Sequence, residues 1–204
     1  APSAPSAPSA PSAPSAPSVP TAPAPSASST PSIPSLPLEV SSLIGSRWKI
    51  MEKIGEGSFS VVFRAFDEVT KEMVAVKVDK AGPTKRKMAA AEALKLQDLQ
   101  ESEYVPKVHA SGWTPGCGYY VMELLGPSLK RFVSKHVMEH RQLLPMRKAL
   151  ELGISMIRAV ESLHDLEYVH RDLKPDNFAF GMEGSANQDK LYIIDFGLAR
   201  KYID

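Results

Sequence analysis

Residues 170–177 read His170-Arg171-Asp172-Leu173-Lys174-Pro175-Asp176-Asn177, and this octapeptide carries the most specific chemical pattern in the chain. Phosphoryl transfer needs a carboxylate that orients a hydroxyl and receives its proton, a cation near the transferred group, and an amide oxygen on a metal ion. Asp172, Lys174 and Asn177 would supply all three from one loop. The alternative is an ordinary polar turn after a helix, but such a turn does not require this combination of aspartate, lysine and asparagine.

A second acidic motif follows at the end of a short apolar strand predicted over residues 191–194. Asp195-Phe196-Gly197 places a carboxylate where it could reach a Mg²⁺ ion that bridges phosphate oxygens. We expect Phe196 to pack underneath and Gly197 to let the chain turn. The tripeptide alone is common, and it gains weight because it follows the 170–177 motif in the expected order.

A glycine-bearing segment, Gly55-Glu56-Gly57-Ser58-Phe59-Ser60, lies between strands predicted over residues 48–54 and 60–66. Glycines allow a tight backbone turn whose N–H groups point at an anionic ligand. Ser60 replaces the third glycine of G-x-G-x-x-G, and we expect it to stiffen the loop or to alter its approach to phosphate. A strand follows this segment rather than a helix. The pattern therefore favours a β-hairpin that covers an anionic ligand over the strand–turn–helix of a dinucleotide-binding site. A plain hairpin turn is the alternative.

Lys77 lies on a third strand, predicted over residues 73–78, and Glu92 lies in a helix predicted over residues 85–99. An ion pair between these side chains would hold the ammonium group against the α- and β-phosphates of a nucleotide. The alternative is a strand lysine that faces the solvent.

Two further elements complete the pattern. A strand is predicted over residues 118–124, and a helix over residues 145–164. The apolar residues of that helix recur at three- and four-residue steps and predict one buried stripe; they are Met146, Ala149, Leu150, Gly153, Ile157, Val160 and Leu163. Strands with one helix, followed by helices, indicate an α+β chain in two lobes.

Composition divides the 204 residues into two parts. Residues 1–38 contain 12 of the 18 prolines and no charged residue, and they open with six Ala-Pro-Ser repeats. Such a segment favours polyproline II, so we expect residues 1–38 to be a disordered Ala/Pro/Ser-rich tail and residues 39–204 to be a domain. The alternative for the tail is a PxxP ligand for SH3 or WW domains.

Charge and hydropathy exclude several classes of protein. The formal net charge of +1 gives no field for a nucleic-acid partner. No apolar stretch approaches the roughly 18 residues of a membrane span. The single cysteine, Cys117, excludes an internal disulfide framework and suits a reducing compartment. Since a signal-peptide pattern is also missing, we expect an intracellular protein, cytoplasmic or nuclear.

Taken in order, these motifs resemble the eukaryotic protein kinases over about residues 47–204. With Lys174 at this position, the 170–177 loop resembles that of the serine/threonine-specific kinases. Three segments are similar to the casein kinase 1 family, which includes the tau-tubulin kinases: residues 122–129, 177–181 and 192–202. The resemblance implies a two-lobed kinase fold, with an N-lobe over about residues 39–125 that holds a five-stranded antiparallel sheet and helix C. A partial helical C-lobe would occupy about residues 126–204.

The same resemblance implies a serine/threonine kinase that uses ATP and Mg²⁺ on protein substrates, acidic or pre-phosphorylated ones included. Asp172, Lys174, Lys77 and Glu92 would be catalytic, and Asn177 and Asp195 would bind the metal. Met122 would be the gatekeeper. The backbones of Glu123 and Leu125 would bond to adenine, and Ile54, Val62 and Ala75 would enclose its ring, beside the loop of residues 55–60.

The chain stops at Asp204, seven residues after Gly197, so we expect an incomplete kinase domain whose 145–164 helix lacks a cover. A truncated kinase-like fragment that binds nucleotide or a partner without turnover is the alternative. A remote alternative is a zinc hydrolase, because residues 136–140 match H-x-x-E-H and would place His136 and His140 on one helix face.

Overall fold

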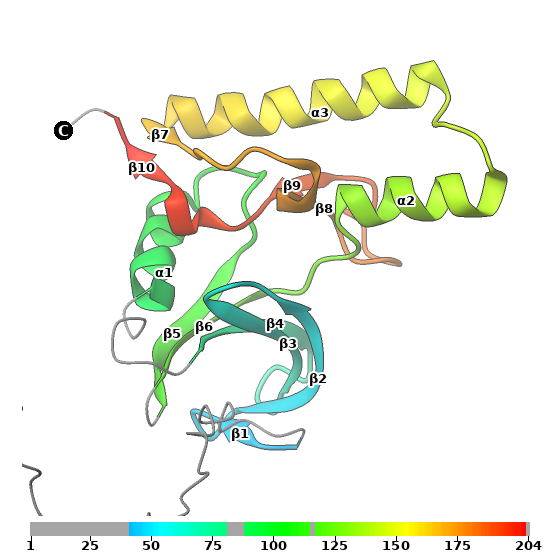
Figure 1. Ribbon diagram of the computed structural model, residues 1–204. Helices are drawn as coiled ribbons and strands as arrows, with labels where there is room; N and C mark the ends of the chain where they lie inside the picture. The colour runs from blue at the N-terminus through cyan, green and yellow to red at the C-terminus, as the bar shows by residue number, and fades with distance from the viewer. Residues whose placement is uncertain (1–40, 81–87, 115–116, 203–204) are drawn as a thin grey trace, which may run out of the picture. The chain divides into compact units, whose positions relative to one another are not determined.

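The computed structural model describes residues 41–80, 88–114 and 117–202. Their first half forms an antiparallel sheet in the order β1-β2-β3-β4-β6-β5, followed by helices and short strands (Figure 1). The sheet strands are β1 (Leu43–Ile44), β2 (Trp48–Glu56), β3 (Ser60–Asp67), β4 (Met73–Asp79), β5 (Val108–Thr114) and β6 (Cys117–Glu123). The mixed α+β architecture and the antiparallel sheet are as predicted.

The sheet has six strands, so the predicted number of five is wrong by one. The sequence analysis assigned residue ranges to β2, β3, β4 and β6 and to neither β5 nor β1, which pairs antiparallel with β2 and buries Ile44. Gly45 makes the connecting turn with φ +57°, and a Cβ there would lie 2.8 Å from the Tyr119 hydroxyl. Glycine suits this position because an L side chain would be strained at this angle and would clash with Tyr119 and Trp48.

Alternation along the strands separates two faces of the sheet. One face buries an apolar cluster that includes Val61, Phe63, Val76 and Val121. The register aligns Val62 with Lys77 and Lys77 with Tyr120, and Ala75 with Met122. Because side chains alternate along a strand, these residues project from the opposite face. Lys77, Val62, Ala75 and Met122 therefore share the face on which the sequence predicts the nucleotide.

Helix α1 (Met88–Asp98) packs against β4, β5 and β6. It buries Ala89, Glu92, Ala93 and Leu96. The buried Asp79 carboxylate at the end of β4 accepts a hydrogen bond from the Ala89 backbone N–H at 3.0 Å. This bond satisfies a free N–H in the first helical turn and links α1 to the strand that carries Lys77.

The second half of the described chain places two helices around short strands. Helix α2 (Leu129–His140) packs against β8 (Phe178–Phe180), and helix α3 (Met146–Asp165) packs against β7 (Tyr168–Val169) and β9 (Leu191–Ile193). Strands β8 and β9 form one antiparallel pair, and β7 pairs with β10 (Arg200–Lys201). Two 3₁₀ turns, η1 (Pro175–Asn177) and η2 (Phe196–Leu198), lie within the two acidic motifs.

Backbone hydrogen bonds join the segment after β6 to β8. The Gly126 N–H donates to the Phe180 carbonyl at 2.9 Å, and the Phe180 N–H donates to the Pro127 carbonyl at 3.1 Å. A Cβ on Gly126 would lie 2.6 Å from the Gly181 carbonyl oxygen, so glycine is required for this close approach. On the other side of the hairpin, the Ile194 N–H donates to the Asn177 carbonyl at 2.9 Å.

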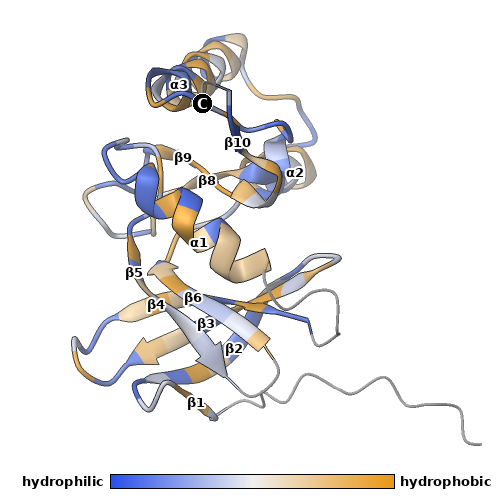
Figure 2. Ribbon diagram, turned by 90° about the vertical axis from the view of Figure 1, so that its left-hand side faces the viewer, coloured by the Kyte–Doolittle hydropathy of each residue, from blue (hydrophilic) through white to orange (hydrophobic). Residues whose placement is uncertain are grey.

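The apolar stripe predicted for residues 145–164 is only partly buried, in agreement with the expectation that the helix lacks a cover. Helix α3 buries Leu152, Ala159 and Leu163. Of the predicted stripe, Met146, Leu150 and Ile157 are 74%, 60% and 68% exposed. Figure 2 shows apolar (orange) and polar (blue) segments along α3, and β7 and β9 contact only one side of its broad apolar surface. The other side is uncovered, as expected for a helix whose partners do not lie in the described residues.

Some predictions fall on residues that the structure does not describe. They are the tail of residues 1–38, the first residues of the domain at 39–40, and the start of the helix predicted over residues 85–99. Among the residues described, no helix is both long enough and apolar enough to cross a membrane.

Candidate active site

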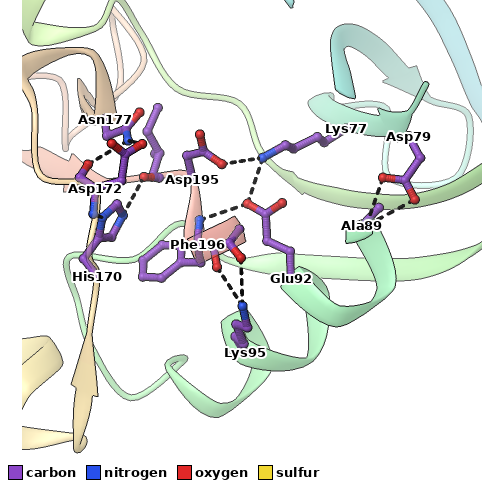
Figure 3. Close-up of polar contacts among 12 residues, drawn as sticks. Lys77, Asp79, Ala89, Glu92, Lys95, His170, Asp172, Asn177, Asp195 and Phe196 are labelled. Atoms are coloured by element: carbon purple, nitrogen blue, oxygen red, sulfur yellow. Dashed lines mark hydrogen bonds and ion pairs between the residues drawn. The ribbon is translucent and has the colours of Figure 1, made fainter. Parts of the chain in front are cut away.

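Lys77 lies at the centre of a buried ion-pair network. Its Nζ is 2.8 Å from Glu92 Oε1 and 3.0 Å from Asp195 Oδ1 (Figure 3). The Lys77 and Glu92 side chains are only 10% and 5% exposed. Burial opposes the ammonium charge, but the two carboxylates outweigh it and raise the pKa of Lys77. The structure thus brings β4, α1 and the second acidic motif together at one charged group.

Glu92 has more contacts than the predicted ion pair. The same Oε1 atom also accepts a hydrogen bond from the Phe196 backbone N–H at 3.0 Å. Tyr120, fully buried beside it on β6, has a pKa raised well above its usual value by burial and by the nearby Glu92 carboxylate. A single oxygen of α1 therefore fixes both the strand lysine and the turn that carries Asp195.

The turn at residues 195–197 differs from the prediction in one respect. Asp195 itself adopts the left-handed backbone conformation, with φ 67° and ψ 74°, whereas Gly197 has no positive φ. The expectation that Gly197 makes the turn is therefore wrong. Phe196 packs as predicted, fully buried with its ring 5.2 Å from that of His170 in an edge-on contact.

The 170–177 loop is held together by its own polar groups. Lys174 Nζ lies 2.6 Å from Asp172 Oδ2, and Asn177 Nδ2 donates to the carbonyl and to Oδ2 of Asp172, both at 2.9 Å. The hydrogen bond from Lys174 is the main cause that lowers the pKa of Asp172. Asp172 is therefore a carboxylate at neutral pH, and the amide oxygen of Asn177 remains available as an acceptor.

His170 supports both motifs, although the sequence analysis gave it no role. Its Nε2 lies 3.0 Å from the Ile194 carbonyl, and its Nδ1 accepts from the Asp172 N–H at 3.3 Å. Because Nδ1 is an acceptor, Nε2 carries the proton and the ring is neutral. Burial lowers the pKa of His170 in the same direction. Its only signal in the sequence is its place two residues before Asp172.

The glycine-bearing segment forms the turn between β2 and β3. Neither Gly55 nor Gly57 has a positive φ, and Ser60 has an ordinary strand backbone at the start of β3. The turn itself therefore does not demand glycine at these positions, and a Cβ there would make only ordinary contacts, with Val62 or with the Ser60 carbonyl oxygen. Hydrogen bonds from Lys80 and Lys53 lower the pKa of Glu56 to about 2, so its carboxylate links the loop to the end of β4.

The residues predicted to enclose adenine lie on adjoining strands. Ala75 is buried and pairs with Met122 across β4 and β6, while Val62 pairs with Gly55 across β2 and β3. Ile54 lies where the β2–β3 register shifts. The Glu123 N–H donates to the Lys107 carbonyl at 2.8 Å, so from its backbone only the carbonyl oxygen could bind adenine. Leu125 lies in the segment that follows β6, next to Gly126.

The two histidines of the H-x-x-E-H segment lie close together on one helix. His136 and His140 stack on α2 with ring centroids 4.4 Å apart, and His140 Nδ1 lies 3.0 Å from the His136 carbonyl. Within the described ranges there is no group of three or more His, Cys, Asp and Glu side chains that could hold a metal ion. Two histidines alone do not make a zinc-hydrolase site, which needs three protein ligands.

The sheet, the lysine network and the paired acidic loops define a site of the phosphoryl-transfer class. Residues 48–204 match the protein kinase domain family, and the chain belongs to that family. The chain is 38% identical over 162 residues to a protein of Dictyostelium discoideum named as a probable serine/threonine-protein kinase. It is 36% identical over 167 residues to a protein of Caenorhabditis elegans that is also named as a serine/threonine-protein kinase.

These alignments cover 79% and 81% of this chain but 32% and 47% of the two relatives. The chain therefore spans between about a third and about a half of the length of these curated relatives. The comparisons support a protein kinase domain homologous to serine/threonine kinases.

Proposed function

We propose that the protein is a serine/threonine protein kinase of the casein kinase 1 type, which transfers the γ-phosphoryl group of ATP to a protein hydroxyl. The observation that carries the proposal is the network in which one ammonium group, on Lys77, contacts both Glu92 and Asp195. In this network Lys77, which would bind phosphate, lies beside a carboxylate of the second acidic motif, and this supports the proposal. The assignment to the casein kinase 1 type rests on the resemblance of residues 122–129, 177–181 and 192–202.

The donor set suits the proposed metal ion. Mg²⁺ prefers oxygen ligands, and the Asp195 carboxylate and the Asn177 amide offer them. Because both observed hydrogen bonds of Asn177 Nδ2 point to Asp172, its amide oxygen is left for a cation. Asn177 and Asp195 would hold Mg²⁺, which supplies charge neutralisation for the phosphate oxygens when bound. The Asp195 side chain is 47% exposed, so it is accessible to such an ion.

The remaining residues bind, orient and accept a proton. Lys77, fixed by Glu92, would hold the α- and β-phosphates under the loop of residues 55–60. Asp172 would orient the substrate hydroxyl and take its proton as the oxygen–phosphorus bond forms and the bond to the ADP leaving group breaks. Its lowered pKa makes it a weak base, so orientation is its main contribution. Lys174, bound to Asp172, would offset charge on the transferred group.

Nucleotide binding and phosphoryl transfer should be measured separately, with γ-labelled ATP, Mg²⁺ and an acidic or pre-phosphorylated peptide. We expect Asp172→Asn to keep ATP binding and to lower transfer by at least about 100-fold, the usual contribution of a positioned acid or base. Glu183→Gln, an exposed change outside the site, is the control. Transfer by Asp172→Asn at the rate of the control would refute the role of Asp172, and ATP binding without transfer by the unmodified chain would favour the non-catalytic alternative.

A further inference from the structure

Helix α1 contacts the 195–197 turn through two side chains that lie one helical turn apart. Glu92 is the residue that the sequence analysis identified, and Lys95 is a residue to which it gave no role. Both point toward the turn in Figure 3. Residues at positions i and i+3 share a helix face, so the two charges approach the turn side by side.

The two side chains bind three backbone groups of the turn. Glu92 Oε1 accepts from the Phe196 N–H at 3.0 Å. Lys95 Nζ donates to the Phe196 carbonyl at 3.2 Å and to the Gly197 carbonyl at 3.0 Å. These contacts involve the backbone, so they fix the path of the chain whatever side chains the turn carries.

The path of this turn needs support. Asp195 has φ 67°, and a non-glycine residue in the left-handed region is disfavoured unless its surroundings hold it. The Asp195 side chain has one ion pair, to Lys77, which is itself shared with Glu92. Lys95 acts immediately C-terminal to Asp195, on two successive carbonyl groups, of which the Phe196 carbonyl also accepts from the Ala199 N–H at 3.1 Å.

The contacts of Lys95 with the turn are specific and not incidental surface contacts. It is only partly exposed on α1, and burial lowers its pKa, with Glu92 and Arg171 as the charged groups that act on it. Its carbonyl partners are over a hundred positions away in the sequence. The ammonium group bridges α1 and the second acidic motif in a part of the site where Phe196 is fully buried.

We propose that Lys95 is a positioning residue, which clamps the Phe196 and Gly197 carbonyls to α1 so that the Asp195 carboxylate is presented to Mg²⁺. The proposal rests on the proposed kinase function. Glu92 links α1 to the nucleotide-binding lysine, and Lys95 links α1 to the metal-binding turn. A shift of α1 would therefore disturb both halves of the site together.

The test compares Lys95→Met with Gln97→Met, which introduces the same side chain at an exposed position of α1. Binding of a fluorescent ATP analogue to the full 204-residue chain is measured at increasing Mg²⁺ and again without Mg²⁺. We expect Lys95→Met to raise the half-saturating Mg²⁺ concentration by at least about fivefold, since hydrogen bonds to a charged group contribute more than neutral ones. Binding without Mg²⁺ should stay unchanged, and Lys95→Arg, which keeps the donors, should recover most of the loss.

Amide hydrogen exchange gives a second measurement that does not depend on nucleotide. Peptides covering residues 195–202 should exchange faster in Lys95→Met, because the Ala199 N–H is bonded to the Phe196 carbonyl that Lys95 holds. Peptides from β2 to β4 should be unchanged. Equal results for Lys95→Met and Gln97→Met, or an equal loss of ATP binding with and without Mg²⁺, would overturn the proposal. If the unmodified chain binds no ATP, the proposed function fails, while exchange still decides whether Lys95 holds the turn.

Discussion

Replacing Glu92 with glutamine removes one negative charge from the buried network while keeping the size of the side chain. Glu92 Oε1 lies 2.8 Å from Lys77 Nζ and 3.0 Å from the Phe196 backbone nitrogen. The amide oxygen of glutamine has two lone pairs and can still accept both of these hydrogen bonds. What it cannot do is neutralise Lys77, whose ammonium group would then depend on Asp195 alone.

The expected loss of stability follows from the burial of the Lys77–Glu92 ion pair. Removing one partner of a buried ion pair costs about 3–5 kcal/mol, because a charge is left uncompensated in a region of low dielectric. Lys77 and Glu92 are 10% and 5% exposed, so solvent screening reduces this little. Asp195 remains 3.0 Å from Lys77, which favours the lower end, about 3 kcal/mol. For a domain of this size that corresponds to a fall in Tm of about 6–12 °C.

Urea and thermal unfolding at neutral pH would measure the change. Glu151→Gln on α3 is the matched control, because Glu151 is 50% exposed and pairs with Arg147 at i,i+4. The free energy of unfolding of the Glu151→Gln variant should fall by no more than about 0.5 kcal/mol. A loss below about 1 kcal/mol for Glu92→Gln would mean that Asp195 and solvent already neutralise Lys77, and the argument from burial would fail.

Three further outcomes are expected. Burial lowers the pKa of His170 from the usual histidine value of 6.5. Below pH 6.5 the unfolded chain therefore binds more protons than the folded chain, and the free energy of unfolding should fall as the pH drops from about 6.5 to 5.5. His170→Gln should flatten that pH dependence of Tm, and a slope identical to that of the unmodified chain would contradict it. Ser60→Gly should change the apparent KM for ATP more than the KM for the peptide, because it alters backbone freedom only beside the nucleotide. Steady-state kinetics with both substrates varied would measure the two constants, and a change confined to the peptide KM would be inconsistent with this prediction. Leu150→Lys with Ile157→Lys should reduce light scattering of concentrated protein, because both residues are exposed on the uncovered face of α3; unchanged scattering would show that this face does not drive association.

The sequence predicted the strands and motifs whose signals are local. β2, β3, β4 and β6 follow from alternation and β-branched residues, and each is found within a few residues of its predicted bounds. The pairing of Lys77 with Glu92 required knowledge of the fold, which only the resemblance supplied. The Glu92 contact with the Phe196 N–H joins positions 104 residues apart, and nothing in the local pattern indicates it.

The errors have physical causes. Strand β1 has two residues, too few for an alternation signal, and its pairing depends on the turn at Gly45. Helix α3 has one broad apolar surface, and periodicity shows that a surface is apolar but not which part of it finds a partner. Asp195 adopts a left-handed conformation because surrounding contacts hold it there, although residue preference assigns that role to Gly197.

The backbone bonds around β8 have a consequence for how the site can vary. The segment proposed to bind adenine is joined to Phe180 through Gly126, β8 is joined to β9, and Asn177 is joined to Ile194, directly before Asp195. Every link is between main-chain atoms, so the interval from the base to the metal is set by peptide geometry rather than by side chains. Side chains of this hairpin can therefore diverge between relatives without changing the distance between the segment proposed to bind adenine and Asp195, whereas a residue larger than glycine at 126 or 181 would clash with the backbone that sets this distance.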